Sequence, residues 1–363
     1  MIPIVKVALP ERDVLMPKLE DVLYSGVIAE GQDVYDFETK FLGHFGIDCG
    51  LAMSSGTAAL HASLTLSWVS CGDEVITTSM TAEPTNLAVL QAGAKPVFAD
   101  VDPVSGNICP DSIESNITNK TKAIIVVHYA GYPARMTEIM DIAARHGLKV
   151  IEDCAHSMGA IYKGKPIGTL ADFSIFSFQA IKHMTTIDGG FLVIKDRSLV
   201  ERAKKFRWFG MLKGADRTTL DISEMGYKYN MHNVAAVIGS LQLDNIDERL
   251  QAHIVNAEYY NRAFAGSGVV TPASFEVGAK PTYWLYTLLV EDSESLISKL
   301  TKAGVQASKL HRPNHLHSIF DQQYKKLPNL EAFYQKLVHI PCGWWVDKDQ
   351  SKMIAEQVLD WSK

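Results

Sequence analysis

The sequence lacks the features that mark membrane, secreted and zinc-binding proteins. None of its apolar runs approaches the 18 residues that a membrane-spanning helix needs. The apolar stretch at its start is short and is broken by Pro3 and Pro10, unlike a signal peptide. Its five cysteines form no CxxC pair and no zinc-type spacing. We therefore expect reduced thiols in a soluble, cytoplasmic protein with no membrane association.

An excess of positive charge is also missing. Lys and Arg number 35 against 41 Asp and Glu, which gives a formal charge of −6. Without a basic patch or a helix-turn-helix pattern, the chain is not expected to bind nucleic acid. No GxGxxG follows the first predicted strand, which argues against a dinucleotide oxidoreductase. Hydrophobic residues make up 47% and charged residues 21%, which excludes a disordered or coiled-coil chain.

What the chain has is a long alternation of short apolar runs with helical patterns. Between about residues 48 and 195, this alternation predicts an α/β domain with a mainly parallel sheet flanked by helices. The expected strands are 50–53, 74–78, 96–100, 122–128, 149–152, 173–178 and 190–194. The expected helices are 57–69, 84–92, 135–146 and 199–206.

The pattern changes after about Met225. A long helical pattern over 234–264 is followed by a break at 266–268, a strand at 283–290 and helices at 293–303 and 351–361. A chain of 363 residues exceeds the size at which one hydrophobic core usually stops growing. We expect a large domain over 1–245, including the N-terminal segment, and a smaller α+β domain over 246–363.

Two polar segments follow predicted strands, where open α/β sheets bind ligands. SSGTAAL, with Gly56 and Thr57, leads from a strand into a helix, and backbone N–H groups at a helix start suit a phosphate. Ser and Thr also cap ordinary helices, so this segment alone favours a cap. IEDCAHS ends a strand on a carboxylate, Asp153, followed by His156. A protonated pyridine nitrogen would be one good partner for that carboxylate, and a capping Asp with a core His is the other reading.

The third segment, FSFQAIKHMTTIDGG, carries the strongest signal. A strand ends near Ser177, Lys182 follows in an apolar stretch, and the chain re-enters a strand through Gly189-Gly190. Desolvation favours the neutral amine of a lysine, which is the form that Schiff-base chemistry needs. A lysine that snorkels from a sheet edge is the alternative.

In this order and spacing, the three segments resemble the DegT/DnrJ/EryC1/StrS family of pyridoxal-phosphate-dependent sugar aminotransferases. The resemblance extends from about Val14 to the C-terminal helix. It implies the fold type I of the aspartate aminotransferase superfamily, with pyridoxal phosphate bound by the large domain. It also implies transfer of an amino group from glutamate to a ketosugar, which is expected to be nucleotide-linked, with pyridoxamine phosphate as the intermediate form of the cofactor.

The resemblance assigns roles position by position. Lys182 matches the lysine that forms the internal aldimine with the cofactor. Asp153 matches the partner of the pyridine nitrogen, and His156 matches a residue near the cofactor's O3′. The positions that match phosphate-binding residues are Gly56, Thr57 and Ser177.

A loop over 226–231 resembles the family segment that reaches the cofactor phosphate of a neighbouring subunit, which implies a homodimer with shared active sites. Here Lys228 stands where the family usually has Asn, and Asn230 where it has Arg. Lys228 is the expected phosphate partner, as a point charge. Ala82 replaces an aromatic residue that commonly covers the pyridine ring, and Asp188 replaces a Glu before the double glycine.

A nucleotide-linked sugar needs cations for its diphosphate. The candidate residues are Arg207, Lys213, Arg217, Lys309, His311 and Arg312. Two alternatives remain at this point: a sugar dehydratase of the same family, in which His replaces the active-site lysine, and a non-catalytic regulatory member. The spacing places Lys182, not His183, at the lysine position, and the retained Lys182 and Asp153 favour a catalyst.

Overall fold

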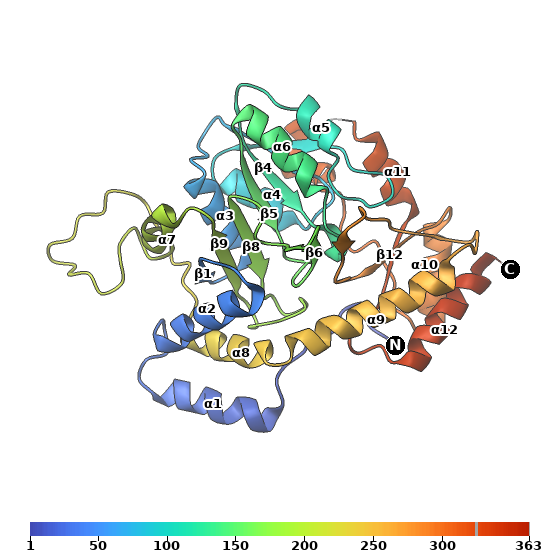
Figure 1. Ribbon diagram of the computed structural model, residues 1–363, viewed down its shortest axis with the longest axis horizontal. Helices are drawn as coiled ribbons and strands as arrows, with labels where there is room; N and C mark the ends of the chain where they lie inside the picture. Colours follow the sequence, from blue (N-terminus) through green and yellow to red (C-terminus); the bar gives the residue numbers. More distant parts are fainter. Residues whose placement is uncertain (324–325, 363) are drawn as a thin grey trace.

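A seven-stranded sheet forms the centre of the computed structural model, which describes residues 1–323 and 326–362 (Figure 1). The strand order is β1-β9-β8-β5-β4-β2-β3. Strand β9 is antiparallel to both of its neighbours, and all other pairs are parallel, so the predicted mainly parallel sheet is confirmed. The strand bounds are β1 Gly50–Met53, β2 Glu74–Thr78, β3 Lys95–Ala99, β4 Thr121–Val127, β5 Lys149–Asp153, β8 Phe173–Ser177 and β9 Gly190–Ile194.

Helices cover both faces of this sheet. One face carries α2 (Gln32–Phe45), α5 (Pro110–Ser115), α6 (Met136–His146) and α8 (Asn233–Leu243), whose apolar residues join one buried cluster. The other carries α3 (Gly56–Leu66), α4 (Glu83–Gln91) and α7 (Val200–Arg207), which contribute to a second cluster. Helix α6 illustrates how the sequence directs a helix onto the sheet, because its apolar residues Met136, Ile139 and Ala143 recur at helical spacing and are buried. Gly147 ends this helix in the left-handed conformation, at φ +65°.

The helices differ from the sequence-based expectation in several places, and α5 was not among the expected helices. The helical pattern over 234–264 is two helices, α8 and α9 (Ile246–Phe264), because Asn245 leaves the helical conformation at φ −123° and ψ 13°. Asp and Asn have low helix propensity, which favours a break at 244–245. The N-terminal helices α1 (Arg12–Tyr24) and α2 were not predicted, although α2 buries Phe37 and Phe41 at helical spacing.

The C-terminal part has a sheet of its own, in the order β10-β12-β13. Its strands are β10 Thr271–Pro272, β12 Tyr286–Leu289 and β13 Leu337–Ile340, and its helices are α10 Ser293–Lys302, α11 Pro328–Lys336 and α12 Lys348–Leu359. A third small sheet joins β11 (Ala279–Lys280) to β6 (Ile161–Tyr162) and β7 (Lys165–Pro166). The core of the C-terminal part includes Phe98 and Tyr129, so it packs against one end of the large sheet.

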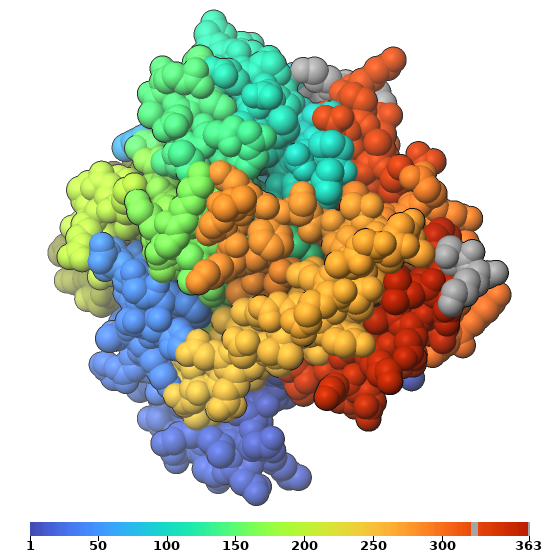
Figure 2. Space-filling view, turned by 45° about the vertical axis from the view of Figure 1, so that its right-hand side comes forward, coloured from blue at the N-terminus to red at the C-terminus, as the bar shows by residue number. Residues whose placement is uncertain are grey.

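Helix α9 crosses the surface between the N-terminal helices and the C-terminal segment (Figure 2). In the part of the chain that the structure describes, no helix is both long and apolar enough to cross a membrane. All five cysteines are free thiols.

Candidate active site

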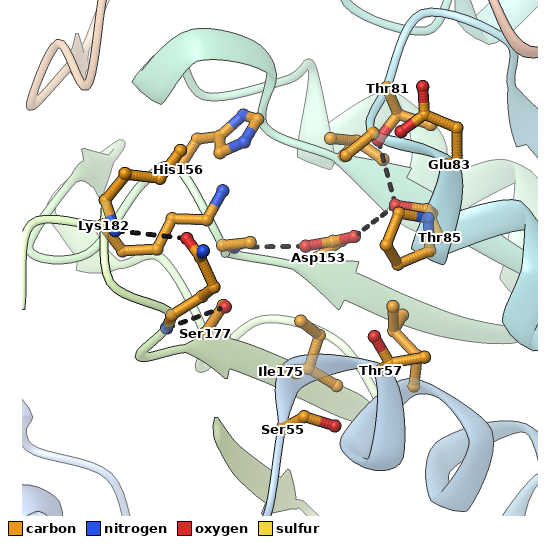
Figure 3. A pocket seen from close by; sticks show the side chains of 18 of the residues that line it. Ser55, Thr57, Thr81, Glu83, Thr85, Asp153, His156, Ile175, Ser177 and Lys182 are labelled. Atoms are coloured by element: carbon orange, nitrogen blue, oxygen red, sulfur yellow. Dashed lines mark hydrogen bonds between the residues drawn. The ribbon is translucent and has the colours of Figure 1, made fainter. Parts of the chain in front are cut away.

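A pocket of about 360 Å³ lies where several strands and loops end (Figure 3). Asp153 is the last residue of β5, Ser177 is the last residue of β8, and Lys182 follows on the β8–β9 loop. The start of α3 closes another side. The sequence-predicted residues that line this one pocket are Gly56, Thr57, Asp153, His156, Ser177, Lys182 and His311.

The Asp153 carboxylate is buried and accepts hydrogen bonds from two groups. The Thr85 hydroxyl donates to Oδ2 at 2.9 Å, and the Ala155 N–H donates to Oδ1 at 3.1 Å. The Thr81 hydroxyl lies 3.0 Å from that of Thr85, so the two hydroxyls form a chain that ends on the carboxylate. Burial raises the pKa of Asp153, whereas these hydrogen bonds and the Lys182 charge oppose the rise. The site therefore presents a fixed hydrogen-bond acceptor at the end of an apolar strand.

Lys182 brings an amine into the same pocket. Burial of this amine lowers its pKa to about 8, while the Asp153 carboxylate acts in the opposite direction. The Nζ atom lies 4.1 Å from the centre of the Trp284 ring. A lysine with this pKa holds a substantial fraction of neutral amine near neutral pH, which is the form that attacks a carbonyl carbon or accepts a proton.

His156 is stacked on Trp284, with ring centroids 4.0 Å apart and planes at 16°. Burial lowers the pKa of His156 well below its ordinary value, so the ring is neutral. Its Nδ1 is buried and finds no hydrogen-bond partner among the described residues. The ring therefore has a hydrogen-bonding atom to offer to a bound molecule.

The N-terminus of α3 is packed too tightly for side chains larger than hydrogen at two positions. A Cβ at Gly56 would come within 3.0 Å of the Ser177 Cβ, and one at Gly190 would lie 2.5 Å from the Gly56 nitrogen. This close approach explains the second glycine of the pair, Gly190, where β9 begins, whereas a Cβ at Gly189 would meet the Thr186 hydroxyl. Ser55 caps the helix by accepting from the Ala58 N–H at 3.0 Å. The first N–H groups of a helix have no intrahelical acceptor, so this end suits an anion.

Of the candidates for binding phosphate or diphosphate by charge, His311 lines this pocket, whereas Arg207, Lys213, Arg217, Lys228, Lys309 and Arg312 lie outside its lining. Arg207 is buried between two carboxylates, Glu30 at 3.2 Å and Glu38 at 2.7 Å, which neutralise its charge. Lys213 donates to the Glu30 carbonyl. Arg217 is exposed.

Lys228 is exposed, donates to Asn230, and lies 4.4 Å from the centre of the Trp208 ring. Lys309 pairs with Glu294 at 3.1 Å, and Arg312 is exposed. Binding roles for these side chains stay predictions.

Two residues in contact with the predicted groups were missed from the sequence. Thr85 is the third residue of α4, and Trp284 lies in the C-terminal part. Neither residue lies in one of the three segments that the sequence analysis identified. Each comes close to the site only when the chain folds.

These groups fit a phosphorylated pyridine such as pyridoxal phosphate. Asp153 offers a carboxylate to a ring nitrogen, Lys182 offers an amine to an aldehyde carbon, and the start of α3 offers N–H groups to a phosphate. A mainly parallel sheet with these groups at its strand ends defines the class of fold type I aminotransferases.

The chain belongs to the DegT/DnrJ/EryC1/StrS aminotransferase family, whose sequence model matches residues 11–359. It is 33% identical to the UDP-4-amino-4-deoxy-L-arabinose–oxoglutarate aminotransferase of Shewanella sediminis, over 94% of this chain and 92% of that protein. The crystal structure of the sugar aminotransferase CalS13 from Micromonospora echinospora superposes with a TM-score of 0.95 at 34% identity, covering 99% of this chain and all of that one. The structure of Spr1654 from Streptococcus pneumoniae in its PMP form matches with a TM-score of 0.91 at 26% identity, covering 99% of this chain and 97% of that one.

Proposed function

We propose that this protein transfers an amino group from glutamate to a nucleotide-linked ketosugar, with pyridoxal phosphate as its cofactor. The observation that carries the proposal is that the Lys182 amine and the Asp153 carboxylate line one pocket beside the start of α3. Its relative in Shewanella sediminis is named for a UDP-linked amino sugar and for oxoglutarate, the keto acid that glutamate leaves behind. The solved PMP form of Spr1654 supports the same cofactor.

When bound, pyridoxal phosphate supplies a pyridine ring that withdraws electrons from the reacting carbon. Asp153, fixed by Thr85 and Ala155, would hold the protonated ring nitrogen, and the α3 N-terminus would hold the phosphate. Lys182 Nζ, as a free amine, would accept the proton released from the α-carbon of the amino donor. In the second half of the reaction it would donate a proton to the carbon of the sugar that becomes aminated. Such transfer by one positioned group contributes about 10²–10⁴-fold to a rate.

The surroundings of His183 favour this reaction over sugar dehydration. His183 is buried with its ring 4.8 Å from that of His253, and it is not among the residues that line the pocket. Lys182 therefore takes the position that a dehydratase gives to histidine.

We further propose a homodimer in which Lys228 of one subunit serves the phosphate site of the other. In its own subunit Lys228 lies outside the pocket lining, and exposed apolar side chains such as Phe209 and Met225 lie on the same segment. Lys213, Lys309 and Arg312 are proposed to meet the nucleotide diphosphate. Residues 1–245 and 246–363 are proposed as the two domains.

The decisive experiment compares Lys182→Ala with Lys204→Ala, which removes an exposed lysine of α7. The purified protein should gain a visible absorbance band with pyridoxal phosphate, and glutamate should bleach this band. Lys182→Ala should lose that band and all transfer to a panel of nucleotide ketosugars, and Lys204→Ala should keep both. Full activity and a borohydride-sensitive band in Lys182→Ala, or a wild-type protein that stays colourless with cofactor, would contradict the proposal.

A further inference from the structure

Trp284 reaches the pocket residues from the C-terminal part of the chain. It lies in the loop before β12 and is 2% exposed. Its backbone presses against Gly131, where a Cβ would lie 2.7 Å from the Trp284 nitrogen, and Gly131 has φ +97°. The neighbouring Leu285 N–H donates to the Ala130 carbonyl at 3.3 Å. The backbone at Trp284 is therefore fixed against the loop that follows β4.

One indole ring makes three contacts with the reactive groups and their loop. It stacks on His156, its face lies 4.1 Å from the Lys182 Nζ, and its Nε1–H donates to the Ile181 carbonyl at 2.9 Å. The last bond holds the backbone one residue before Lys182. Trp284 thus contacts both the side chain and the loop of the lysine.

The ring face acts differently on the two forms of the lysine. An ammonium is attracted to the negative face of an indole, and desolvation strengthens the attraction, whereas a neutral amine has no such gain. Among the titratable groups around this amine, Asp153 favours the ammonium. Burial lowers the pKa values of His156, His183 and His311, so these rings are neutral. The carboxyl groups of Glu83 and Asp188 line the same pocket.

We propose that Trp284 is a positioning residue of the transamination site, holding the free Lys182 amine by its ring face and the Lys182 loop through the Ile181 carbonyl. The proposal rests on the proposed function. In that reaction Lys182 alternates between a protonated and a neutral amine, and Trp284 gives the protonated side chain a defined place. A change at this ring should therefore alter the protonation of Lys182 without removing any group that lines the pocket.

The test measures the pH at which Lys182 becomes reactive. Full-length protein loaded with pyridoxamine phosphate, which leaves the lysine amine free, is labelled with acetic anhydride, and the Lys182 peptide is quantified by mass spectrometry. Trp284→Leu should lower the labelling midpoint by about one pH unit, and Trp284→Phe, which keeps an aromatic face, by less than half of that. The control is Trp344→Phe, since Trp344 has Lys6 over its ring at 5.2 Å but lies away from the pocket.

A midpoint that stays at the wild-type value in folded Trp284→Leu would overturn the proposal. If that variant does not fold, Trp284→Met, which also removes the aromatic face, is measured in its place, and an unchanged midpoint overturns the proposal. Failure of the wild-type protein to take up pyridoxamine phosphate would instead count against the proposed function. Labelling of the unloaded full-length chain then still decides the role of Trp284.

Discussion

Replacing Thr85 with valine should destabilise the protein in a way that depends on pH. Valine has nearly the shape of threonine but cannot donate to Asp153 Oδ2, which the Thr85 hydroxyl reaches at 2.9 Å. It also leaves the buried Thr81 hydroxyl without its partner at 3.0 Å. A hydrogen bond to a charged group contributes about 1.5–3 kcal/mol, and one between neutral groups about 0.5–1.5 kcal/mol. The loss should therefore be largest where Asp153 is ionised.

The direction of this pH dependence follows from the pKa of Asp153, which burial raises. The folded protein binds this proton more tightly than the unfolded chain, so stability falls as pH rises through the unfolded and then the folded pKa. Valine raises the folded pKa further and extends that fall. We expect a loss of about 2–3 kcal/mol at pH 7, and about 1 kcal/mol near pH 3, where the carboxyl is mainly protonated in both states.

Urea unfolding of cofactor-free, full-length protein at the two pH values measures this difference. The matched control is Thr65→Val, because the Thr65 hydroxyl donates only to the His61 carbonyl of its own helix, at 3.0 Å. Its effect should be small and equal at both pH values. An equal loss for Thr85→Val at both pH values, or a loss below about 0.5 kcal/mol at pH 7, would refute the role given to the hydroxyl.

Three further changes test other parts of the structure. Burial raises the pKa of Glu152 to about 7, so the contribution of this group to the unfolding free energy falls between about pH 5 and pH 7. The unfolding free energy of Glu152→Gln minus that of the wild type should therefore increase over this range in a pH series of urea titrations, and a difference that does not change with pH would contradict the assignment. Arg207→Met should lower the free energy of unfolding by about 3–5 kcal/mol, because it leaves the carboxylates of Glu30 and Glu38 without their cation. Lys40→Met, which removes an exposed ion pair, should lower it by less than about 1 kcal/mol in the same urea titrations. Equal losses would be incompatible with this reasoning. Gly131→Ala should lower the thermal unfolding midpoint far more than Gly147→Ala, because only the Cβ added at Gly131 would lie within 3 Å of backbone atoms. Similar midpoints would show that the loop around Gly131 shifts to accommodate the added Cβ.

The sequence predicts those parts of the fold that are determined by residues close together along the chain. Each strand of the large sheet is a short apolar run, and all seven runs appear as strands, with bounds shifted by at most a residue or two. The double glycine at 189–190 marks the start of β9 because a Cβ at Gly190 would collide with the start of α3. The break between α8 and α9 was missed because the apolar spacing continues through Asn245 and only the backbone angles reveal it.

The candidate site likewise has residues that the sequence identifies and contacts that only the structure shows. Lys182, Asp153 and His156 are identifiable because each follows an apolar strand in a short segment of unusual composition, and the fold brings all three to one pocket. Arg207 was a candidate for substrate binding on charge alone, and only its buried contacts with Glu30 and Glu38 show that its charge is neutralised within the chain.

The sequence by itself determined the mainly parallel sheet, the family, and the residues that stand at the strand ends, because periodicity and spacing along the chain encode them. The tertiary structure alone decided which side chains surround those residues. The hydroxyl of Thr85 and the ring of Trp284 come from α4 and from the loop before β12, and each contacts its partner only after the helix and the C-terminal part have packed against the sheet. Such contacts leave no periodic signal, since they depend on distances through space between segments far apart in the chain.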